Sequence, residues 1–511
     1  MTASLSEVVA GHATERPDHP AFLCEGRVTT WSDYDRAARV NAGRLVEAGL
    51  ARGDRVAVVL PDGPGVHEWF LGVERAGMVI VGIGPRAGEA EVRHLLERSG
   101  ARALVSSPVL AGRDAGEVVA GLGDAGLDLL HIPAAVDPPQ GGPVGDGPGV
   151  GPDELWLLNS TSGTTGLPKC VMHTQSRWMY FHQLAVQAGG MTADDVFMSL
   201  LPAPFGFGLW TAHFTPTLLG APVAVMPRFS AAEAVRLAAD LRVTVLACVT
   251  TQLVMMLNDP GLGGADLGAL RAVFTGGEAV PYERAAEFED RTGARVLQFY
   301  GSNETGALSH TSLADDREHR LRTAGRVIPG MHVRLLDGEE DVTATGGPGE
   351  PVCRGPATSL GYWDDPEANA RLLTADGWMR TGDLAELDSD GYLRIVGRLS
   401  DIIIRGGKNI SAGQVEADVG THPAVAMVAA VAMPDEVFGE RVCVYVVARP
   451  GPVPTLEDVI DHLLRRGVGK ELLPEHLVVV DSLPTASGGK VAKGQLRADI
   501  RRRMEGTAAG G

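Results

Sequence analysis

The sequence predicts an α/β protein, in which a large N-terminal domain of two α/β subdomains and a distorted β-barrel precedes a small α+β C-terminal domain. The length of 511 residues is about three times that of a usual domain, so several hydrophobic cores are expected. Apolar runs alternate with helical patterns through much of the chain, which is typical of βαβ units and parallel sheets. Near residue 400 this pattern changes. The predicted domains are therefore residues 1–399 and 400–511.

The first α/β subdomain is expected over residues 1–150. Apolar runs there predict buried strands at residues 55–60 and 103–105. Helical patterns cover residues 37–48, 65–76 and 89–99. A segment rich in proline and glycine, residues 134–153, is expected to be a linker that leads into the next subdomain.

The second α/β subdomain shows the same alternation. It has predicted helices at residues 176–187, 231–241 and 252–257, and predicted strands at residues 196–200 and 243–249. Glycine and proline then become dense over residues 325–355, between short alternating segments such as residues 332–336. This pattern predicts the antiparallel, barrel-like piece of the large domain.

The C-terminal domain is predicted as a small α+β unit. Its apolar runs predict strands at residues 402–404, 425–432, 442–448 and 477–480. Its helical patterns cover residues 412–419 and 456–466.

Composition excludes several classes of function. A net charge of −19 argues against binding to nucleic acid or to an anionic membrane surface. The five cysteines show no metal-ligand spacing, so neither a zinc site nor a disulfide framework is expected. The first residues lack the pattern of a signal peptide, and no run of 18 apolar residues occurs. A cytoplasmic protein, monomeric or homodimeric, is therefore expected.

A loop of small polar residues follows the apolar run at residues 155–158, and residues 159–174 read NSTSGTTGLPKCVMHT. Small side chains let successive backbone N–H groups turn inward, which is how a chain cradles phosphate. Lys169 can add a full positive charge. Leu167 and Pro168 separate the last glycine from Lys169, so the order is not that of a Walker A loop. The alternative is a flexible linker.

The loop resembles the phosphate-binding loop of the adenylate-forming superfamily, which contains acyl-CoA synthetases, adenylation domains and luciferases. The resemblance covers essentially the whole chain and is closest to acyl- or aryl-CoA ligases, because five further motifs occur in the superfamily's order. One departure is Cys170, where the family usually has glycine. The resemblance implies that Lys169 is catalytic and that the loop binds ATP through Thr161, Ser162, Gly163, Thr164, Thr165 and Gly166.

Two of these motifs are GGEAV (276–280) and FYGSNETG (299–306). The first follows a predicted strand at residues 272–274, and α/β sheets bind ligands at such strand ends. From the residues alone the two motifs could also be a plain turn and a surface loop. The resemblance implies that Glu304 is catalytic and binds Mg²⁺. It also implies that Asn303 lies beside the α-phosphate, where the family mostly has threonine. The other implied ATP contacts are Gly277, Glu278, Tyr300 and Gly301.

Two implied nucleotide contacts and one implied catalytic residue lie nearer the C-terminus. A long motif ends in RTGD, and the resemblance implies that Asp383 accepts hydrogen bonds from the ribose hydroxyls. Arg398 would reach ribose or phosphate. In LPTASGGKVAK, Lys490 matches the catalytic lysine of the adenylating pose. From the residues alone, Asp383 could be a turn residue and Lys490 a solvated side chain.

The motif GRLSDIIIRGGKNIS (397–411) carries the expected mobility of the small domain. The resemblance implies that Ser400 is the hinge about which this domain rotates, although the family prefers aspartate or lysine there. After rotation, Gly406 and Gly407 would line the tunnel for CoA.

The segment LPAPFGFGLW (201–210) matches the family's acyl-binding wall, with Phe205 as a steric guard. Amino-acid adenylation domains have aspartate at the next position, where this chain has Gly206. A buried ammonium would be unpaired there, so α-amino acids are not expected. Glycines at 206, 208, 276, 277 and 301 predict a roomy pocket. Its further walls suit an aromatic or bulky alicyclic acid, and they are Phe207, Trp210, Phe214, Thr250 and Thr251. The implied pocket residues are Phe205, Gly206, Phe207, Thr250, Gly276 and Gly301.

Together these motifs predict an AMP-forming acid–thiol ligase. ATP and Mg²⁺ would convert a carboxylic acid to an acyl-adenylate, and the thiol of CoA would then take the acyl group. One alternative is a stand-alone adenylating enzyme that passes the acyl group to a carrier protein or stops at the adenylate. A luciferase-like oxygenase and a catalytically silent binding protein are alternatives of a different class.

Overall fold

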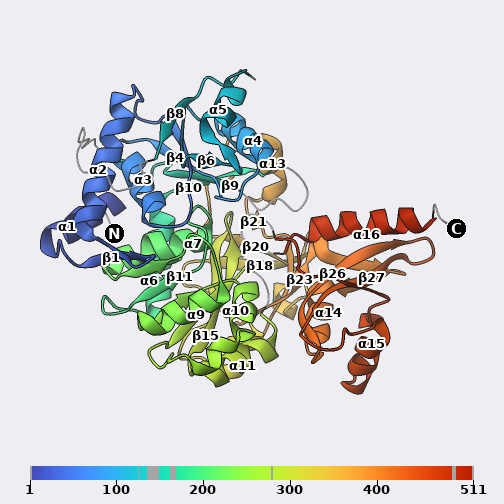
Figure 1. The fold of residues 1–511 in the computed structure, drawn as a ribbon. Coiled ribbons are helices and arrows are strands. Elements are labelled where there is room, and N and C mark those ends of the chain that lie inside the picture. The colour runs from blue at the N-terminus through green and yellow to red at the C-terminus, as the bar shows by residue number, and fades with distance from the viewer. Residues whose placement is uncertain are drawn as a thin grey trace.

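The computed structural model describes residues 3–124, 126–134, 149–160, 168–277, 280–485 and 491–508. Figure 1 shows two α/β subdomains, drawn in blue and in green to yellow, and a separate small domain in orange and red. The predicted α/β class and the division into a large and a small domain are confirmed.

The first subdomain is built on a six-stranded sheet, parallel except for β10 at its edge. Alternate residues of β3 point to opposite faces: Val56 and Val58 pack in one core, and Ala57 and Val59 in another. Helices α2 and α3 cover the first face, and α4 and α5 the second. The strand order is β10 (Cys170–His173), β9 (Leu157–Ser160), β4 (Val79–Gly82), β3 (Arg55–Val59), β5 (Ala103–Ser106) and β8 (Leu130–Pro133), and the helices are α2 (Trp31–Glu47), α3 (Pro64–Arg75), α4 (Glu89–Ser99) and α5 (Ala115–Asp124).

The second subdomain is built on a nine-stranded sheet whose centre is parallel. Helix α6 (Gln175–Gly189) packs on one face, and α9 (Ala231–Asp240), α10 (Thr250–Leu257) and α11 (Tyr282–Thr292) pack on the other. The strand order is β17 (Arg326–Val327), β16 (Gly306–His310), β15 (Arg295–Ser302), β14 (Ala272–Gly276), β13 (Val245–Ala247), β11 (Phe197–Ser199), β12 (Val223–Val225), β1 (Pro20–Cys24) and β2 (Arg27–Thr30).

The barrel-like piece consists of short antiparallel strands. One group is β19 (Glu340–Asp341), β18 (His332–Asp337), β20 (Glu350–Arg354) and β21 (Met379–Arg380), and the other is β22 (Asp383–Leu387) with β23 (Leu393–Arg398). A bridge from Gly349 to Ala385 joins the two groups, and Leu335, Ala385 and Leu393 form their common core.

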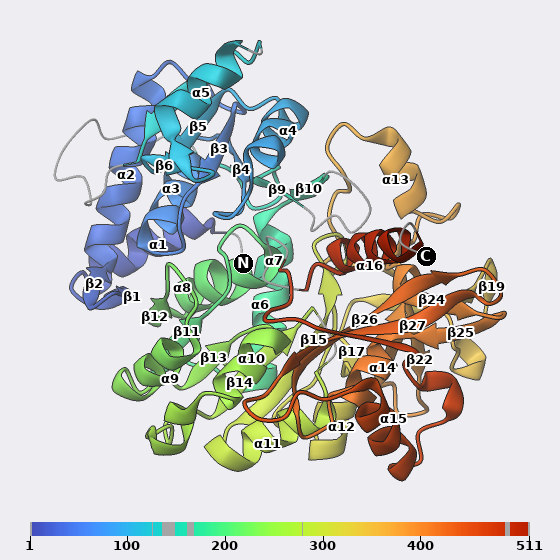
Figure 2. The ribbon, with the colours of Figure 1, turned by 45° about the vertical axis from the view of Figure 1, so that its right-hand side comes forward.

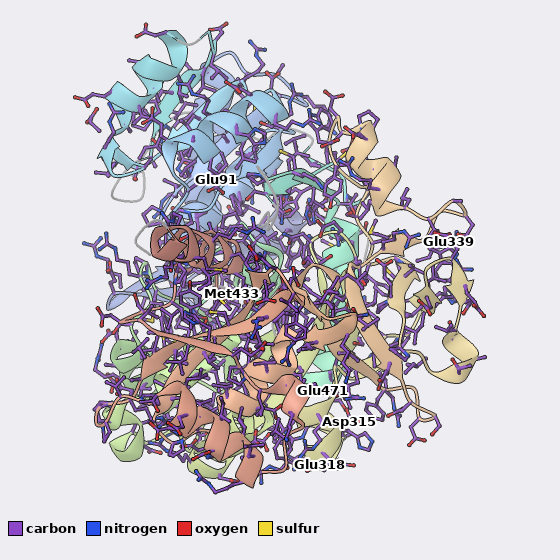
Figure 3. The ribbon with its side chains drawn as sticks, turned by 90° about the vertical axis from the view of Figure 1, so that its right-hand side faces the viewer. Glu91, Asp315, Glu318, Glu339, Met433 and Glu471 are labelled. Atoms are coloured by element: carbon purple, nitrogen blue, oxygen red, sulfur yellow. The ribbon has the colours of Figure 1, made fainter. Side chains whose placement is uncertain are left out.

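The small domain is a five-stranded sheet with helices on both faces. Figure 2 shows α16 (Lys493–Ala508) along one face, where it packs on β26. Helices α14 (Ala412–Val419) and α15 (Leu456–Arg465) cover the other face. Figure 3 looks onto this domain, with Met433 labelled on its sheet. The strands are β24 (Ile402–Arg405), β25 (Lys408–Ser411), β26 (Val425–Asp435), β27 (Gly439–Ala448) and β28 (His476–Val479).

The predicted helices and strands named above are present, and their ends differ for local reasons. Helix α2 begins six residues before its predicted start, because Thr30 and Asp33 form a capping box at its N-terminus. A π-helix at residues Leu209–Phe214 was not predicted. In the described part of the chain, no helix is both long and apolar enough to cross a bilayer.

Candidate active site

A cleft of about 1980 Å³ runs between the two domains. Its floor lies at the carboxyl ends of β14 and β15, where an α/β sheet leaves its loops open to a ligand. The small domain contributes residues of α14 and the start of α16 to the opposite wall.

The structure brings most of the predicted site residues together in this cleft. The residues that line it are Lys169, Phe205, Gly206, Phe207, Thr250, Gly276, Gly277, Tyr300, Gly301, Asn303, Glu304, Asp383 and Arg398. Ser400, Gly406 and Gly407 do not line it. The other predictions, Thr161, Ser162, Gly163, Thr164, Thr165, Gly166, Glu278 and Lys490, lie outside the described residues.

The nucleotide end of the cleft contains a carboxylate that is held by two donors. Tyr300 donates its hydroxyl to Asp383 across 2.6 Å, and Arg398 Nε donates to the other carboxylate oxygen across 3.1 Å. Burial, with Asp383 alongside, holds the pKa of Tyr300 well above its ordinary value, so the tyrosine stays a donor. The three side chains form one fixed polar group, suited to the two hydroxyls of a ribose.

Glu304 and Lys169 both contact the side chain of Tyr362. The sequence analysis assigned no role to this residue. Tyr362 donates its hydroxyl to Glu304 Oε1 across 2.8 Å, and Lys169 Nζ lies 4.8 Å from the centre of the same ring. Ser359 N–H donates to the Glu304 carbonyl across 2.7 Å. Lys169 and Glu304 are therefore positioned on the same side of the cleft.

Glu304 could supply one oxygen ligand to a magnesium ion. Only one carboxylate oxygen of Glu304 accepts a hydrogen bond from the described residues. Those residues contain no group of three or more His, Cys, Asp or Glu side chains that could hold a metal by themselves. Mg²⁺ in nucleotide sites is bound by one or two carboxylates together with phosphate and water, and Glu304 can supply one of these ligands.

Asn303 links the phosphate-loop strand to the acyl wall. Its side-chain oxygen accepts from Asn159 Nδ2 across 3.2 Å and from the Gly206 N–H across 3.1 Å. Its nitrogen donates to the Ser160 carbonyl across 3.4 Å. The sequence analysis missed Asn159 and His173, although polar residues near the ends of the apolar strands β9 and β10 were a usable signal. It also missed Arg177, which lies on α6 and contacts His173.

The glycines of the site have a different role from the one expected. A Cβ at Gly276 would lie 2.7 Å from the Phe299 carbonyl oxygen, and one at Gly301 would lie 1.8 Å from the Gly306 carbonyl oxygen. A Cβ at Gly208 would lie 2.1 Å from the Pro202 carbonyl oxygen. These glycines are required by close backbone packing, so they do not by themselves indicate a roomy pocket.

Aromatic rings line the part of the cleft where the acyl pocket is expected. Phe207 packs edge-on against Phe299 with centroids 4.5 Å apart, and it stacks on Trp210 at 5.7 Å. Trp210 in turn contacts Phe181 and Phe274. Flat, apolar walls of this kind favour a flat or alicyclic ligand.

The small domain touches the large one through a limited set of contacts. Arg284, on α11, donates to the carbonyls of Gly420 and Val425 across 3.2 and 3.4 Å. The neighbouring Glu283 pairs with Arg466 at 3.3 Å. In this pose Lys493 and Gln495 line the cleft, whereas Gly406 and Gly407 lie in the exposed turn between β24 and β25. Ser400 lies in an exposed turn of 3-10 helix, Leu399–Asp401.

Comparisons with known proteins identify the family of this chain. Residues 9–363 match the family model of the AMP-binding enzymes, and residues 414–490 match the AMP-binding enzyme C-terminal domain. The chain belongs to this family. Its resemblance to the adenylate-forming superfamily, closest to the acyl- and aryl-CoA ligases, is therefore confirmed.

Two curated relatives and one solved structure illustrate the likeness. The chain is 33% identical to a medium-chain fatty-acid–CoA ligase of Escherichia coli strain K12, over 98% of this chain and 91% of that protein. It is also 33% identical to a feruloyl-CoA synthase of an Amycolatopsis species, over 94% and 96% of the two chains. The ATP-bound structure of MatB from Rhodopseudomonas palustris superposes with a TM-score of 0.85 at 26% identity, covering 98% of this chain and 99% of that one.

Proposed function

We propose that this enzyme converts a carboxylic acid and ATP to an acyl-adenylate and pyrophosphate, and then transfers the acyl group to the thiol of CoA with release of AMP. The observation that carries the proposal is that one cleft contains both a group suited to the nucleotide and a wall suited to the acid. Tyr300, Asp383 and Arg398 form a ribose-type site at one end, and aromatic rings line the other. Glu304 and Lys169 line the same cleft.

The chemistry needs positioning and charge stabilisation more than a protein nucleophile. The substrate carboxylate attacks the α-phosphorus, and pyrophosphate leaves. Lys169 and the expected Lys490 stabilise charge that develops on the phosphates. Glu304 would hold Mg²⁺, which neutralises charge on the phosphate oxygens. The Asn303 amide donates toward the α-phosphate.

The second half-reaction needs the small domain to move. Gly406 and Gly407 are exposed in the present pose, as expected if they meet the CoA thiol only after rotation about Ser400. The thiolate then attacks the acyl carbon, and AMP leaves.

An aromatic or bulky alicyclic acid is the substrate class that we propose. Support comes from the rings of Phe207, Trp210 and Phe299, and from Gly206 in place of a carboxylate that would pair with an α-ammonium. The feruloyl-CoA synthase among the relatives acts on an aromatic acid, whereas the E. coli relative acts on fatty acids.

ATP–pyrophosphate exchange tests the proposal directly. The purified enzyme is assayed with Mg²⁺ against aryl, alicyclic, medium-chain fatty and α-amino acids. Exchange should be fastest with aryl or alicyclic acids and absent with α-amino acids. A preference for fatty acids would overturn the proposed substrate class, and absence of exchange with every acid would overturn the adenylation step.

The acceptor is tested by product analysis with the best acid. If CoA is the acceptor, adding CoA should produce acyl-CoA and one AMP for each thioester. If adenylate accumulates and CoA is not consumed, the acyl group goes to a carrier protein or the reaction ends at the adenylate.

A further inference from the structure

A buried chain of polar side chains runs from α6 to the cleft. It consists of Arg177, His173, Asn159 and Asn303, and we refer to these four residues as the asparagine relay. Arg177, His173 and Asn159 are 3%, 0% and 1% exposed, whereas Asn303 reaches the cleft. The relay connects residues up to 144 positions apart in the sequence.

The direction of the first two hydrogen bonds is set by Arg177. Its Nη1 lies 2.7 Å from His173 Nδ1, and a guanidinium can only donate, so Nδ1 must be the acceptor. Burial and the neighbouring Arg177 hold the pKa of His173 well below its ordinary value, so the ring is neutral. The proton of the neutral ring is therefore on Nε2, which donates to Asn159 Oδ1 across 2.8 Å.

That direction continues to Asn303. Because the oxygen of Asn159 is the acceptor, its nitrogen faces Asn303 and donates to Oδ1 of that residue. The Gly206 N–H donates to the same oxygen, and a Cβ at Gly206 would lie only 2.7 Å from it. The Asn303 nitrogen is thereby turned toward the Ser160 carbonyl. An amide nitrogen carries two protons, and only one has a partner among the described residues.

Arg177 also holds the backbone of the same loop. It donates to the carbonyls of Asn303 and Ala357 across 2.9 and 2.8 Å. Its Nη2 also donates to the Glu304 carbonyl, across 3.5 Å. Arg177 is therefore a buried charge whose donors go to His173 and to backbone carbonyls of this loop, so it holds the loop as well as the relay.

We propose that Arg177 and His173 are positioning residues, which fix the Asn303 amide so that its second N–H points at an oxygen of the α-phosphate. The inference rests on the proposed function, because it names the group that contacts the nucleotide. A reversed amide would present its oxygen to the phosphate, and the two would repel each other. The relay therefore favours the donating orientation before substrate binds.

Four variants test the relay. His173→Phe removes both ring nitrogens but keeps a ring to stack on Trp178, which lies 5.5 Å away. Asn303→Ala removes the amide, and the double variant removes both. His182→Phe is the matched control, because His182 on α6 is also a buried histidine, and its ring nitrogen contacts Thr215 outside the relay.

Each variant is measured in two ways, by AMP affinity in titration calorimetry and by the initial rate of acid-dependent pyrophosphate exchange. Asn303→Ala should lower the exchange rate by about 10²-fold, as loss of a donor to a developing oxyanion does. His173→Phe should lower it by about tenfold, as loss of one orienting hydrogen bond does. The double variant should match Asn303→Ala alone, because His173 acts only through Asn303. His182→Phe should leave the rate per folded enzyme unchanged.

Three results would overturn the inference. The first is additive losses in the double variant, with a fall of about 10³-fold. The second is a His173→Phe variant with full AMP affinity and exchange rate per folded molecule, in which only the folded fraction is reduced. The third is an equal loss in His182→Phe. If the wild type binds AMP but shows no exchange with any acid, the proposed function fails, and the relay is judged from the AMP titrations alone.

Discussion

The two walls of the cleft are built in opposite ways. On the large-domain wall, Asn159, His173 and Asp383 are almost fully buried, and each has at least two hydrogen-bond partners. The small-domain wall is docked through contacts such as the Glu283–Arg466 pair, whose side chains are about half exposed. Hydrogen bonds from Arg284 to the carbonyls of Gly420 and Val425 add to this docking. The large-domain wall is therefore held by buried hydrogen bonds within one domain, whereas the docking of the small domain includes an exposed ion pair.

The energies of these contacts support the same reading. Removing one partner of a buried hydrogen-bonded group costs about 1–3 kcal/mol, whereas exposed ion pairs contribute at most about 1 kcal/mol. The buried hydrogen bonds of the large-domain wall are therefore worth more than the exposed Glu283–Arg466 pair. A ligase with two half-reactions needs this difference, because the nucleotide must stay in place while the second domain changes its pose.

The largest expected effect comes from removing the positive charge of Lys490, which belongs to the small domain. Lys490→Ala should lower adenylate formation by about 10²-fold or more and spare thioesterification of a supplied acyl-adenylate. The reason is that this lysine is expected to contact phosphate only in the first pose. The two half-reactions are measured separately, with Lys470→Ala, an exposed lysine of the small domain, as the control. Equal losses in both half-reactions would contradict the assignment of Lys490.

The next effect tests the large-domain wall. Asp383→Ala removes the acceptor of Tyr300 and Arg398 and should raise the Michaelis constant for ATP by about 30-fold. Asp383→Asn keeps the shape and one acceptor, so its effect should be smaller. Initial rates at saturating acid give both constants, and unchanged ATP kinetics in Asp383→Ala would make this residue a turn residue only.

A moderate effect is expected at the junction of the two walls. Ser400→Pro fixes the backbone φ in the exposed turn and should lower thioesterification by about tenfold, with adenylation preserved. Ser400→Ala keeps the backbone free and serves as the control. If both half-reactions decline together in Ser400→Pro, the proline has destabilised the fold and the hinge assignment loses its support.

The smallest effect concerns the docking contact itself. Glu283→Gln weakens the pair with Arg466 and should raise the ratio of thioesterification to adenylation by about twofold. The ratio should respond less at high salt, because exposed charges are screened. Glu233→Gln, in an exposed pair with Arg236 on α9, is the matched control. An unchanged ratio would show that this contact does not hold the adenylating pose.

The sequence by itself determined the elements and the chemical groups of this protein. Apolar runs such as residues 55–60 and 103–105 became β3 and β5, because burial on a sheet face imposes a local pattern. The resemblance placed Tyr300, Glu304 and Asp383 in the site, since each lies in a short motif that can be recognised without knowledge of its neighbours. These features depend on residues that are close together along the chain.

Only the tertiary structure decided how distant groups meet. Local sequence does not show that Asn159 faces Asn303, 144 residues away, or that Tyr362 donates to Glu304. It also does not show that Gly276 and Gly301 are required by carbonyl oxygens of neighbouring backbone. The orientation of an amide or an imidazole depends on partners that come together only when the chain packs, so the donors and acceptors of this site were set by the fold.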